Sequence, residues 1–181
     1  MVEALDASAT PYMLTGSLVS SLQGEPRSTH DMDFVVLLDD DSASGLATAL
    51  SKIGGYIDDA ALHRAVRNKA MFNLIDPGSG TKVDFWLLTD SAFDESRFAR
   101  RRTERLLNID IWVSTPEDTI LAKLQWGKLS GGSEKQFMDA LRVYELQHPS
   151  LDRVYLDEWV GSLGLQAEWR RLLDEAQPLD R

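Results

Sequence analysis

The amino-acid sequence predicts an α+β protein in which a mixed β-sheet, flanked by helices, is followed by a C-terminal helical region. Short runs of β-branched and apolar residues alternate with helical patterns up to residue 114, as in sheets that helices cover. From Thr115 onward, apolar residues recur at helical spacing almost to the end of the chain. We therefore expect a core over residues 1–114 and a helical region over 115–181 that packs on it. The two can also count as one domain.

Four segments of the first part carry the strand pattern. Each is rich in apolar and β-branched residues, and turn-forming residues bound it. The four are residues 31–38, 70–75, 82–88 and 109–113. Residues 76–80 give a strong turn signal, and the segments on either side are similar in length. We expect these two segments to form an antiparallel hairpin, which makes the sheet a mixed one.

Helical patterns precede, separate and follow these strands. The expected helices cover residues 17–22, 42–53, 93–105, 116–128, 134–146, 151–163 and 166–176. An acidic turn at 39–41 ends the first strand before a helix begins. The best-marked helix start is Thr115, a natural N-cap, with Pro116 at the first helical position and Asp118 completing a capping box.

The composition is that of a folded protein. Hydrophobic residues make up 43% and charged residues 27% of the 181 residues, which suits a chain with one sizeable core. No stretch approaches the roughly 20 apolar residues that span a bilayer, and the acidic first residues predict no signal peptide. The chain has no cysteine, which excludes disulfides and thiolate metal sites and fits the cytoplasmic location that we expect.

The formal net charge is -10, which disfavours non-specific binding to long polyanions. A phosphate ligand can still bind if divalent cations bridge it to carboxylates. Five arginines lie in the helix expected over 93–105, and they form either a solvated helix face or a docking patch for RNA or a phosphorylated acceptor. They are Arg97, Arg100, Arg101, Arg102 and Arg105.

Three aspartates carry the functional prediction. Asp31 and Asp33 lie two residues apart on an expected strand, so their side chains share one face at about 7 Å. Two carboxylates so placed repel each other and favour a hard divalent cation such as Mg²⁺. Asp84 is a lone carboxylate in an apolar strand, and it either joins them as a third ligand or pairs with Lys82. Three such carboxylates can hold two metals.

Gly16 and Ser17 lie upstream of these aspartates, with thirteen residues between Ser17 and Asp31. A glycine lets the backbone approach a phosphate closely, and a helix that begins near Ser17 offers free N–H groups. The Ser17 hydroxyl can donate a further bond, or it can act as a helix N-cap. We therefore expect Gly16 and Ser17 to bind nucleotide phosphates.

Together these motifs resemble the nucleotidyltransferase superfamily with the DNA-polymerase-β-like fold. Its signature is Gly-Ser, a spacer, Asp-x-Asp on a strand, and a third Asp on a later strand. Three segments are also similar to the small prokaryotic branch that includes the AbiEii-type toxins: residues 24–35, 115–124 and 133–140. The resemblance spans residues 12–146 and implies a nucleotidyltransferase core over 1–114.

The resemblance also implies roles for residues outside the aspartates. Lys123 and Asp139 correspond to a late lysine and aspartate that help to bind the nucleotide in that branch. Arg27 is either a phosphate contact or a solvated loop residue. A surface position is the alternative for Lys123, and solvent exposure is favoured for Asp139, because Phe137 and its helical neighbours define another face.

The function that the resemblance implies is transfer of a nucleoside monophosphate from an NTP to an acceptor hydroxyl, with release of pyrophosphate. Mg²⁺ or Mn²⁺ would be bound by Asp31, Asp33 and Asp84, and the acceptor is an RNA, a protein or a small molecule. A catalytically silent nucleotide-binding module and the toxin of a toxin–antitoxin pair remain as alternatives, the second with an antitoxin partner. Five tryptophans and the helical tail are compatible with a homodimer.

Overall fold

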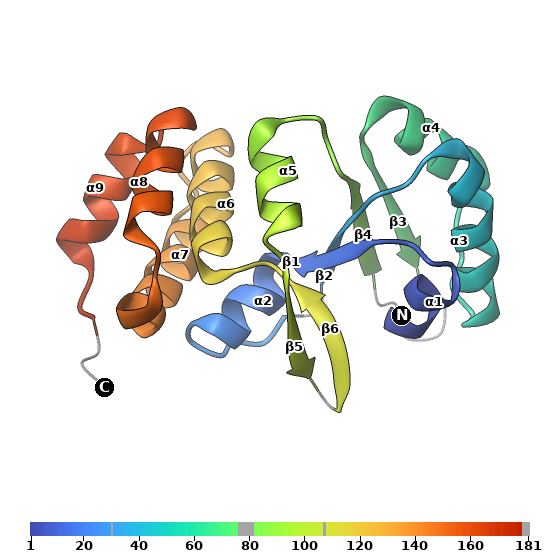
Figure 1. The fold of residues 1–181 in the computed structure, drawn as a ribbon, viewed down its shortest axis with the longest axis horizontal. Helices are drawn as coiled ribbons and strands as arrows, with labels where there is room; N and C mark the ends of the chain where they lie inside the picture. The colour runs from blue at the N-terminus through green and yellow to red at the C-terminus, as the bar shows by residue number, and fades with distance from the viewer. Residues whose placement is uncertain (30, 76–81, 107, 179–181) are drawn as a thin grey trace. The chain divides into compact units, whose positions relative to one another are not determined.

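The computed structural model describes residues 1–29, 31–75, 82–106 and 108–178 (Figure 1). The chain divides into two compact units. The first consists of Met1–Thr15 and Thr29–Val113, and the second of Gly16–Ser28 and Ser114–Arg181. The segment Gly16–Ser28, which lies within the predicted core of 1–114, thus groups with the later helices.

The first unit is built on a six-stranded sheet in the order β3-β4-β2-β1-β6-β5. The strands are β1 (Tyr12–Thr15), β2 (Met32–Val36), β3 (Met71–Ile75), β4 (Lys82–Leu87), β5 (Arg102–Leu106) and β6 (Ile109–Val113). β2 pairs with β4 and β1 with β6 in parallel, and the other neighbours are antiparallel. The predicted mixed sheet is confirmed, as is the antiparallel pairing of β3 with β4. The turn predicted at 76–80 lies outside the described residues.

Both faces of this sheet carry apolar side chains. On one face, Phe34 and Phe72 stack on either side of Phe85, with ring centroids 5.7 and 4.9 Å from it. On the other face, Met13 and Val35 pack against Phe98 of α5 (Ala92–Ala99). The face of α5 is also the face on which Asp33 and Asp84 lie, because side chains alternate along β2 and β4.

Three further helices belong to the first unit: α1 (Val2–Ala7), α3 (Asp40–Lys52) and α4 (Asp59–Asn68). α3 lies beside α1 and α4, and α4 lies beside β3 (Figure 1). The acidic residues predicted as a turn begin α3 instead, because Asp39 accepts a hydrogen bond from the Ser42 N–H in a capping box. α4 is a helix that is not predicted from the sequence, and it buries Leu62, Ala65 and Val66 at helical spacing.

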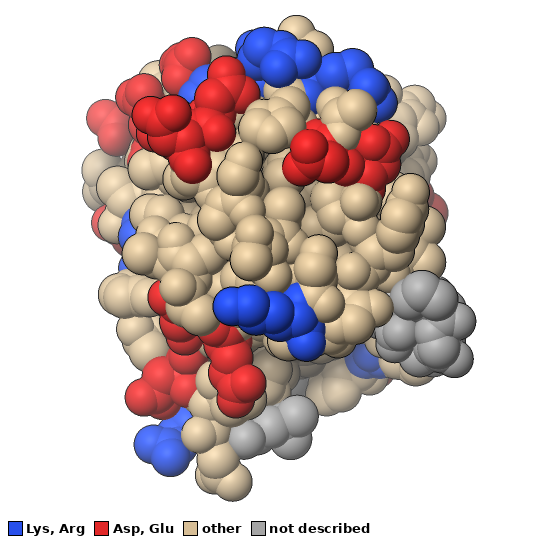
Figure 2. Space-filling model, turned by 90° about the vertical axis from the view of Figure 1, so that its right-hand side faces the viewer, with Lys and Arg blue, Asp and Glu red and all other residues tan. Residues whose placement is uncertain are grey.

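The face of the first unit on which α3 and α4 lie is shown in Figure 2. Acidic and basic side chains gather there in separate groups around a broad area of uncharged residues. α3 and α4 both begin with acidic residues, and α4 carries Arg67 in its last turn. The groups of opposite sign are typical of a solvated surface rather than of one that binds a long polyanion.

One predicted element is wrong. The helix expected over 93–105 ends at Ala99, and Arg102–Leu106 forms β5. β5 pairs with β6 over its whole length, which satisfies its backbone groups on one side. Arg101 lies between them, with its guanidinium carbon 4.2 Å from the Phe98 ring centroid and 5.2 Å from that of Trp112. The five arginines from Arg97 to Arg105 therefore do not share a helix face.

The second unit is helical, as the sequence predicts. It contains α2 (Gly16–Gln23), α6 (Pro116–Leu129), α7 (Glu134–Gln147), the short 3₁₀ helix η1 (His148–Ser150), α8 (Arg153–Ser162) and α9 (Gln166–Glu175). α6 and α7 pack along each other, α2 contacts both, and α9 lies against α7 (Figure 1). In the described part of the chain, no helix has both the length and the apolar composition needed to cross a lipid bilayer.

Two side-chain hydrogen bonds, one of them buried, hold α2 to the second part of this unit. Gln23 Nε2 donates to the Ser114 carbonyl at 2.7 Å, and Gln147 Nε2 donates to the Gln23 carbonyl at 2.8 Å. The next residue, Gly24, approaches the backbone of α7 closely. A Cβ atom at Gly24 would lie 2.9 Å from both the Ser20 carbonyl oxygen and the Val143 nitrogen. The segment after α2 therefore packs on α7 without room for a side chain.

We predict that Gly24→Ala destabilises the protein by about 1–3 kcal/mol, because backbone atoms must shift to admit a methyl group. Gly45→Ala in α3 is the control, since a Cβ there meets nothing within 4 Å. Alanine also favours a helix over glycine by about 1 kcal/mol. Urea unfolding of both variants measures the difference. Equal stabilities for the two variants would contradict the close packing of Gly24 on α7.

Candidate functional site

A row of polar side chains crosses the sheet of the first unit. Asp33 of β2 lies directly opposite Asp84 of β4, and neighbouring strands are about 4.8 Å apart. The row continues on both sides, because Asn73 of β3 pairs with Asp84 and Thr15 of β1 pairs with Asp33. Residues opposite each other in a ladder share a face of the sheet. All four polar side chains therefore project from the same face.

Asp31 is placed differently from the prediction that it lies within the strand. β2 begins at Met32, and Asp31 is an exposed residue just before it. The Asp31 carbonyl accepts a long hydrogen bond of 3.5 Å from the Thr29 hydroxyl. The structure thus brings Asp33 and Asp84 together in one ladder, with Asp31 two residues upstream at the end of the strand.

Asp84 forms an ion pair with Lys82, which is the alternative that the sequence left open. Lys82 Nζ lies 2.9 Å from Asp84 Oδ1 and donates a hydrogen bond to Oδ2 at 3.0 Å. The side chains are 45% and 16% exposed, respectively. Asp33 accepts a hydrogen bond of 3.4 Å from the indole Nε1 of Trp86, the residue two positions beyond Asp84. Each carboxylate thus has a donor on β4.

The donor set suits a hard divalent cation. Asp84 Oδ1 is buried, and its 2.9 Å contact with Lys82 Nζ is an ion pair without hydrogen-bond geometry. Mg²⁺ binds through one or two carboxylates together with substrate phosphates, and Asp33 and Asp84 supply two. Among the described residues, no group of three or more His, Asp or Glu side chains is arranged to hold a metal ion. The two carboxylates therefore fit a metal that also takes oxygen ligands from its substrate.

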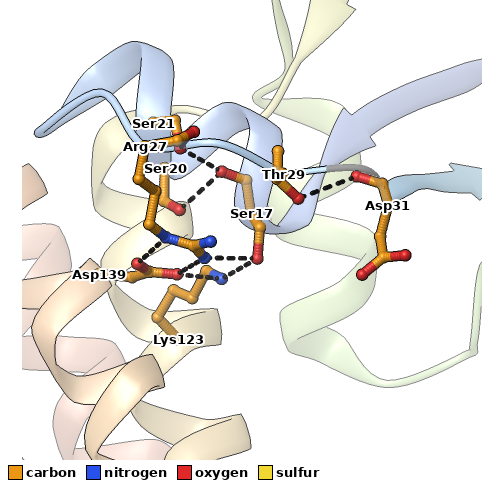
Figure 3. Close-up of polar contacts among 8 residues, drawn as sticks. All are labelled: Ser17, Ser20, Ser21, Arg27, Thr29, Asp31, Lys123 and Asp139. Atoms are coloured by element: carbon orange, nitrogen blue, oxygen red, sulfur yellow. Dashed lines mark hydrogen bonds and ion pairs between the residues drawn. The ribbon is translucent and has the colours of Figure 1, made fainter.

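The second unit contains a separate cluster of charged residues, drawn in Figure 3. Arg27 binds Asp139 through two parallel hydrogen bonds, Nε to Oδ1 at 2.9 Å and Nη2 to Oδ2 at 2.8 Å. Lys123 Nζ donates to Asp139 Oδ2 at 2.8 Å. Ser17 Oγ lies within reach of both cations, 2.8 Å from Arg27 Nη2 and 3.4 Å from Lys123 Nζ. Two cations thus converge on one carboxylate and one hydroxyl.

Burial makes this cluster energetically significant. The side chains of Lys123 and Asp139 are 6% and 9% exposed, whereas that of Arg27 is 30% exposed. Burial alone would raise the pKa of Asp139, but the hydrogen bonds from Arg27 and Lys123 outweigh it and hold this pKa below its usual value. The hydrogen bond to Asp139 raises the pKa of Arg27. Asp139 and Arg27 are therefore charged at neutral pH.

The expected solvent exposure of Asp139 is wrong, and so is the alternative of a surface position for Lys123. The sequence argument assigned α7 one apolar face, which includes Phe137. In the structure α7 contacts α2 as well as α6, so a second face is covered and Asp139 lies on it. A helix packed on two sides buries charged residues only in pairs.

The start of α2 has the backbone geometry that the Gly-Ser motif predicts. Gly16 has a φ of 70°, a backbone conformation that residues other than glycine rarely adopt. Ser17 then lies in the first turn, and its carbonyl accepts hydrogen bonds from the Ser20 and Ser21 hydroxyls at 3.1 and 2.9 Å. Because its Oγ accepts from two cations, the Ser17 O–H remains available as a donor to an anion.

Two residues of the polar row were missed by the sequence analysis. Asn73 interrupts an apolar strand at the position that faces Asp84, and Thr15 ends β1 directly before Gly16. The alternation of β3 could have signalled Asn73, because a polar residue inside a strand needs a polar neighbour. Thr15 gives no such signal, since its partner follows only from the register of β1 with β2.

Comparison with solved structures identifies the fold. ANT(2'')-Ia in complex with adenylyl-2''-tobramycin matches with a TM-score of 0.57 and 12% identity, covering 90% of this chain and 92% of that one. The lincosamide antibiotic adenylyltransferase LnuA, lincomycin-bound, matches with a TM-score of 0.53 and 16% identity over 78% and 90%. An antigenic nucleotidyltransferase-like protein from Paracoccidioides brasiliensis matches with a TM-score of 0.51 and 18% identity over 98% and 91%.

Neither a protein-family model nor a curated protein sequence matches the chain. The structural matches nevertheless cover most of both chains and include the sheet and the helices. The chain therefore has the nucleotidyltransferase fold, and the predicted fold class is confirmed. The AbiEii-type branch stays a prediction.

We predict that Asp139→Asn destabilises the protein by about 3–5 kcal/mol at pH 7, because the buried Lys123 loses its ion pair with the Asp139 carboxylate. The loss should shrink in acid. The pKa of Asp139 is lowered on folding, so its ion pairs stabilise the fold above the unfolded value of about 3.9 and lose this effect as the pH falls through the lower folded-state pKa.

Urea unfolding of the wild type and of Asp139→Asn between pH 7 and pH 3 measures this dependence. Asp157→Asn, which alters an exposed carboxylate of α8, is the control and should be nearly neutral throughout. A difference between wild type and Asp139→Asn that stays constant down to pH 3 would show that Asp139 stabilises the unit by some other means than its charge.

Proposed function

We propose that this protein is a metal-dependent nucleotidyltransferase that moves a nucleoside monophosphate from an NTP to an acceptor hydroxyl. The observation that carries the proposal is the direct pairing of Asp33 with Asp84 on adjacent parallel strands, in a chain with the nucleotidyltransferase fold. A pair of carboxylates on one face of a sheet is costly unless a cation offsets their repulsion. Asp31, two residues before Asp33, is assigned as the third ligand of Mg²⁺ or Mn²⁺.

The reaction is a displacement at the α-phosphorus. The acceptor oxygen forms a bond to phosphorus while the bond to the oxygen that bridges to the β-phosphorus breaks, and the electron pair leaves with pyrophosphate. The acceptor proton passes to Asp84. A bound divalent cation supplies charge neutralisation at the phosphates and lowers the pKa of the attacking hydroxyl. The contribution of the chain is to position and to neutralise charge rather than to form a covalent intermediate.

For the second unit we propose phosphate binding. The Ser17 hydroxyl, the Arg27 guanidinium and the Lys123 ammonium converge within hydrogen-bonding distance, and Gly16 allows close approach of the backbone. These are the donor types that bind phosphate oxygens. Asp139 belongs to the nucleotide site through the two cations that it orients.

The acceptor class is open within this proposal to an RNA, a protein or a small molecule. Two proteins of the same fold have been solved in complex with adenylyl-2''-tobramycin and with lincomycin bound, respectively. Small antibiotic molecules are therefore acceptors to test beside tRNA and the protein itself. A homodimer, an antitoxin partner and a cytoplasmic location stay predictions.

One observation favours a second candidate, a nucleotide-binding or regulatory module without turnover. Asp84 is already paired with Lys82, so a metal ion or an acceptor proton has to compete with the ammonium group for this carboxylate. Calorimetry separates the candidates. Binding of Mg²⁺–NTP without release of pyrophosphate would support the silent module.

The toxin hypothesis would be supported by growth arrest on expression that a neighbouring gene relieves.

We predict that the protein transfers label from an α-labelled NTP to an acceptor in the presence of Mg²⁺ or Mn²⁺, and that Asp33→Asn lowers the rate about a hundredfold or more. The reason is the loss of one of two paired carboxylate ligands. The exposed Asp41 of α3 gives the matched control Asp41→Asn, which should retain full activity. Transfer that survives in Asp33→Asn would overturn the mechanism.

We also predict that Lys123→Met weakens nucleotide binding about tenfold, because a buried charge-assisted donor is lost. Lys135→Met removes an exposed charge from α7 and should leave the affinity unchanged. Calorimetric titration with a non-hydrolysable ATP analogue measures both. Equal affinities of the two variants would reject the phosphate binding that we propose for the second unit.

A further inference from the structure

Lys82 and Asp84 lie on the same face of β4, two residues apart, and their ion pair occupies the carboxylate assigned to the metal. Lys82 Nζ is within 3.0 Å of both carboxylate oxygens. Asp33 lies opposite Asp84 on the next strand. The structure thus shows Asp84, one of these two neighbouring carboxylates, with a cation of the protein's own.

The pair can open without disturbing the fold. The Lys82 side chain is 45% exposed, whereas that of Asp84 is only 16% exposed, so the mobile partner is the lysine. A lysine side chain is a flexible stem with a strongly hydrated head. A divalent cation can therefore displace the ammonium group while the Asp84 carboxylate stays in place.

We infer that Lys82 is a specificity-determining counter-ion, which a divalent cation must displace from Asp84 and which makes the site favour a metal–triphosphate complex over the free metal. This inference rests on the metal-dependent function proposed above. In the absence of nucleotide, the lysine repels an incoming cation. A metal–triphosphate complex carries net negative charge, so the displaced ammonium group attracts it instead. Lys82 thus weakens the binding of the free metal and strengthens the binding of the metal–triphosphate complex.

The consequence is that free Mg²⁺ or Mn²⁺ occupies the carboxylates weakly, and the metal enters with the triphosphate. Trp86 and Asn73 do not oppose this exchange, since both are uncharged neighbours on the same face of the sheet. The lysine is therefore a positioning and selecting group rather than a metal ligand, because an ammonium nitrogen has no lone pair to donate.

The experiment compares Lys82→Met, which removes the charge and keeps the length of the stem, with Lys82→Arg, which keeps the charge. Binding of Mn²⁺ alone and of Mn²⁺ with the α,β-methylene analogues of the four NTPs is measured by calorimetry. Lys82→Met should bind free Mn²⁺ about three- to tenfold more tightly than the wild type and the Mn²⁺–analogue complex about threefold more weakly. Lys82→Arg should stay within about twofold of the wild type for both ligands.

Two further variants keep the outcomes distinct. Asp84→Asn should lose Mn²⁺ binding, and Lys52→Met, which removes an exposed charge at the end of α3, should bind like the wild type. If Asp84→Asn loses binding but Lys82→Met gains none, the selecting role of Lys82 is rejected and the metal site stands. If the wild type and all variants bind no Mn²⁺, with or without analogue, the metal-dependent function is rejected together with this inference.

Thermal unfolding in the presence of EDTA adds a second measure. Lys82→Met should unfold at a lower temperature than the wild type, because Asp84 then lies opposite Asp33 without its ion pair to Lys82, and added Mn²⁺ should restore the unfolding temperature. A variant whose unfolding temperature equals that of the wild type in EDTA would contradict the counter-ion role.

Discussion

The parallel pairing of β2 with β4 is the constraint on which the candidate metal site depends. A shift of one residue in this register would turn one of the two aspartates to the opposite face of the sheet. The register is fixed by the apolar residues that follow, because Phe34 stacks on Phe85 and Val35 packs beside Trp86 on the other face. The aromatic core thus determines where the charges lie, although no aromatic ring takes part in the proposed chemistry.

In the second unit the positions of the charged side chains are also fixed by the interior, here through a buried ion cluster. Asp139 holds Arg27 from the segment after α2 and Lys123 from α6, so one carboxylate fixes three separate stretches of chain. The orientation of the two cations is settled before any ligand arrives, which reduces the entropy lost on binding. The cluster thus combines a structural role with the phosphate-binding role that we propose.

Much of the fold could be predicted from the sequence, because capping residues and apolar periodicity mark most helices. The Thr115–Pro116 start of α6 is an example, since its signals are local. The helix predicted over 93–105 failed because the competing interaction is non-local, namely the pairing of β5 with β6. For the candidate site, the three aspartates are visible in the sequence. The burial of Asp139 and the partnership of Thr15 with Asp33 depend on packing and register, which no local pattern encodes.

The division of the chain into units has a consequence for how it can be cut. The backbone passes from one unit to the other three times, after Thr15, Ser28 and Val113. Neither unit is a continuous stretch of sequence. A fragment that ends at Val113 would retain α2 but lack α6 and α7, so the buried Val19 and Gln23 would face water. Truncation therefore cannot isolate either half, and an excised sheet would carry an unfolded insertion between its first two strands.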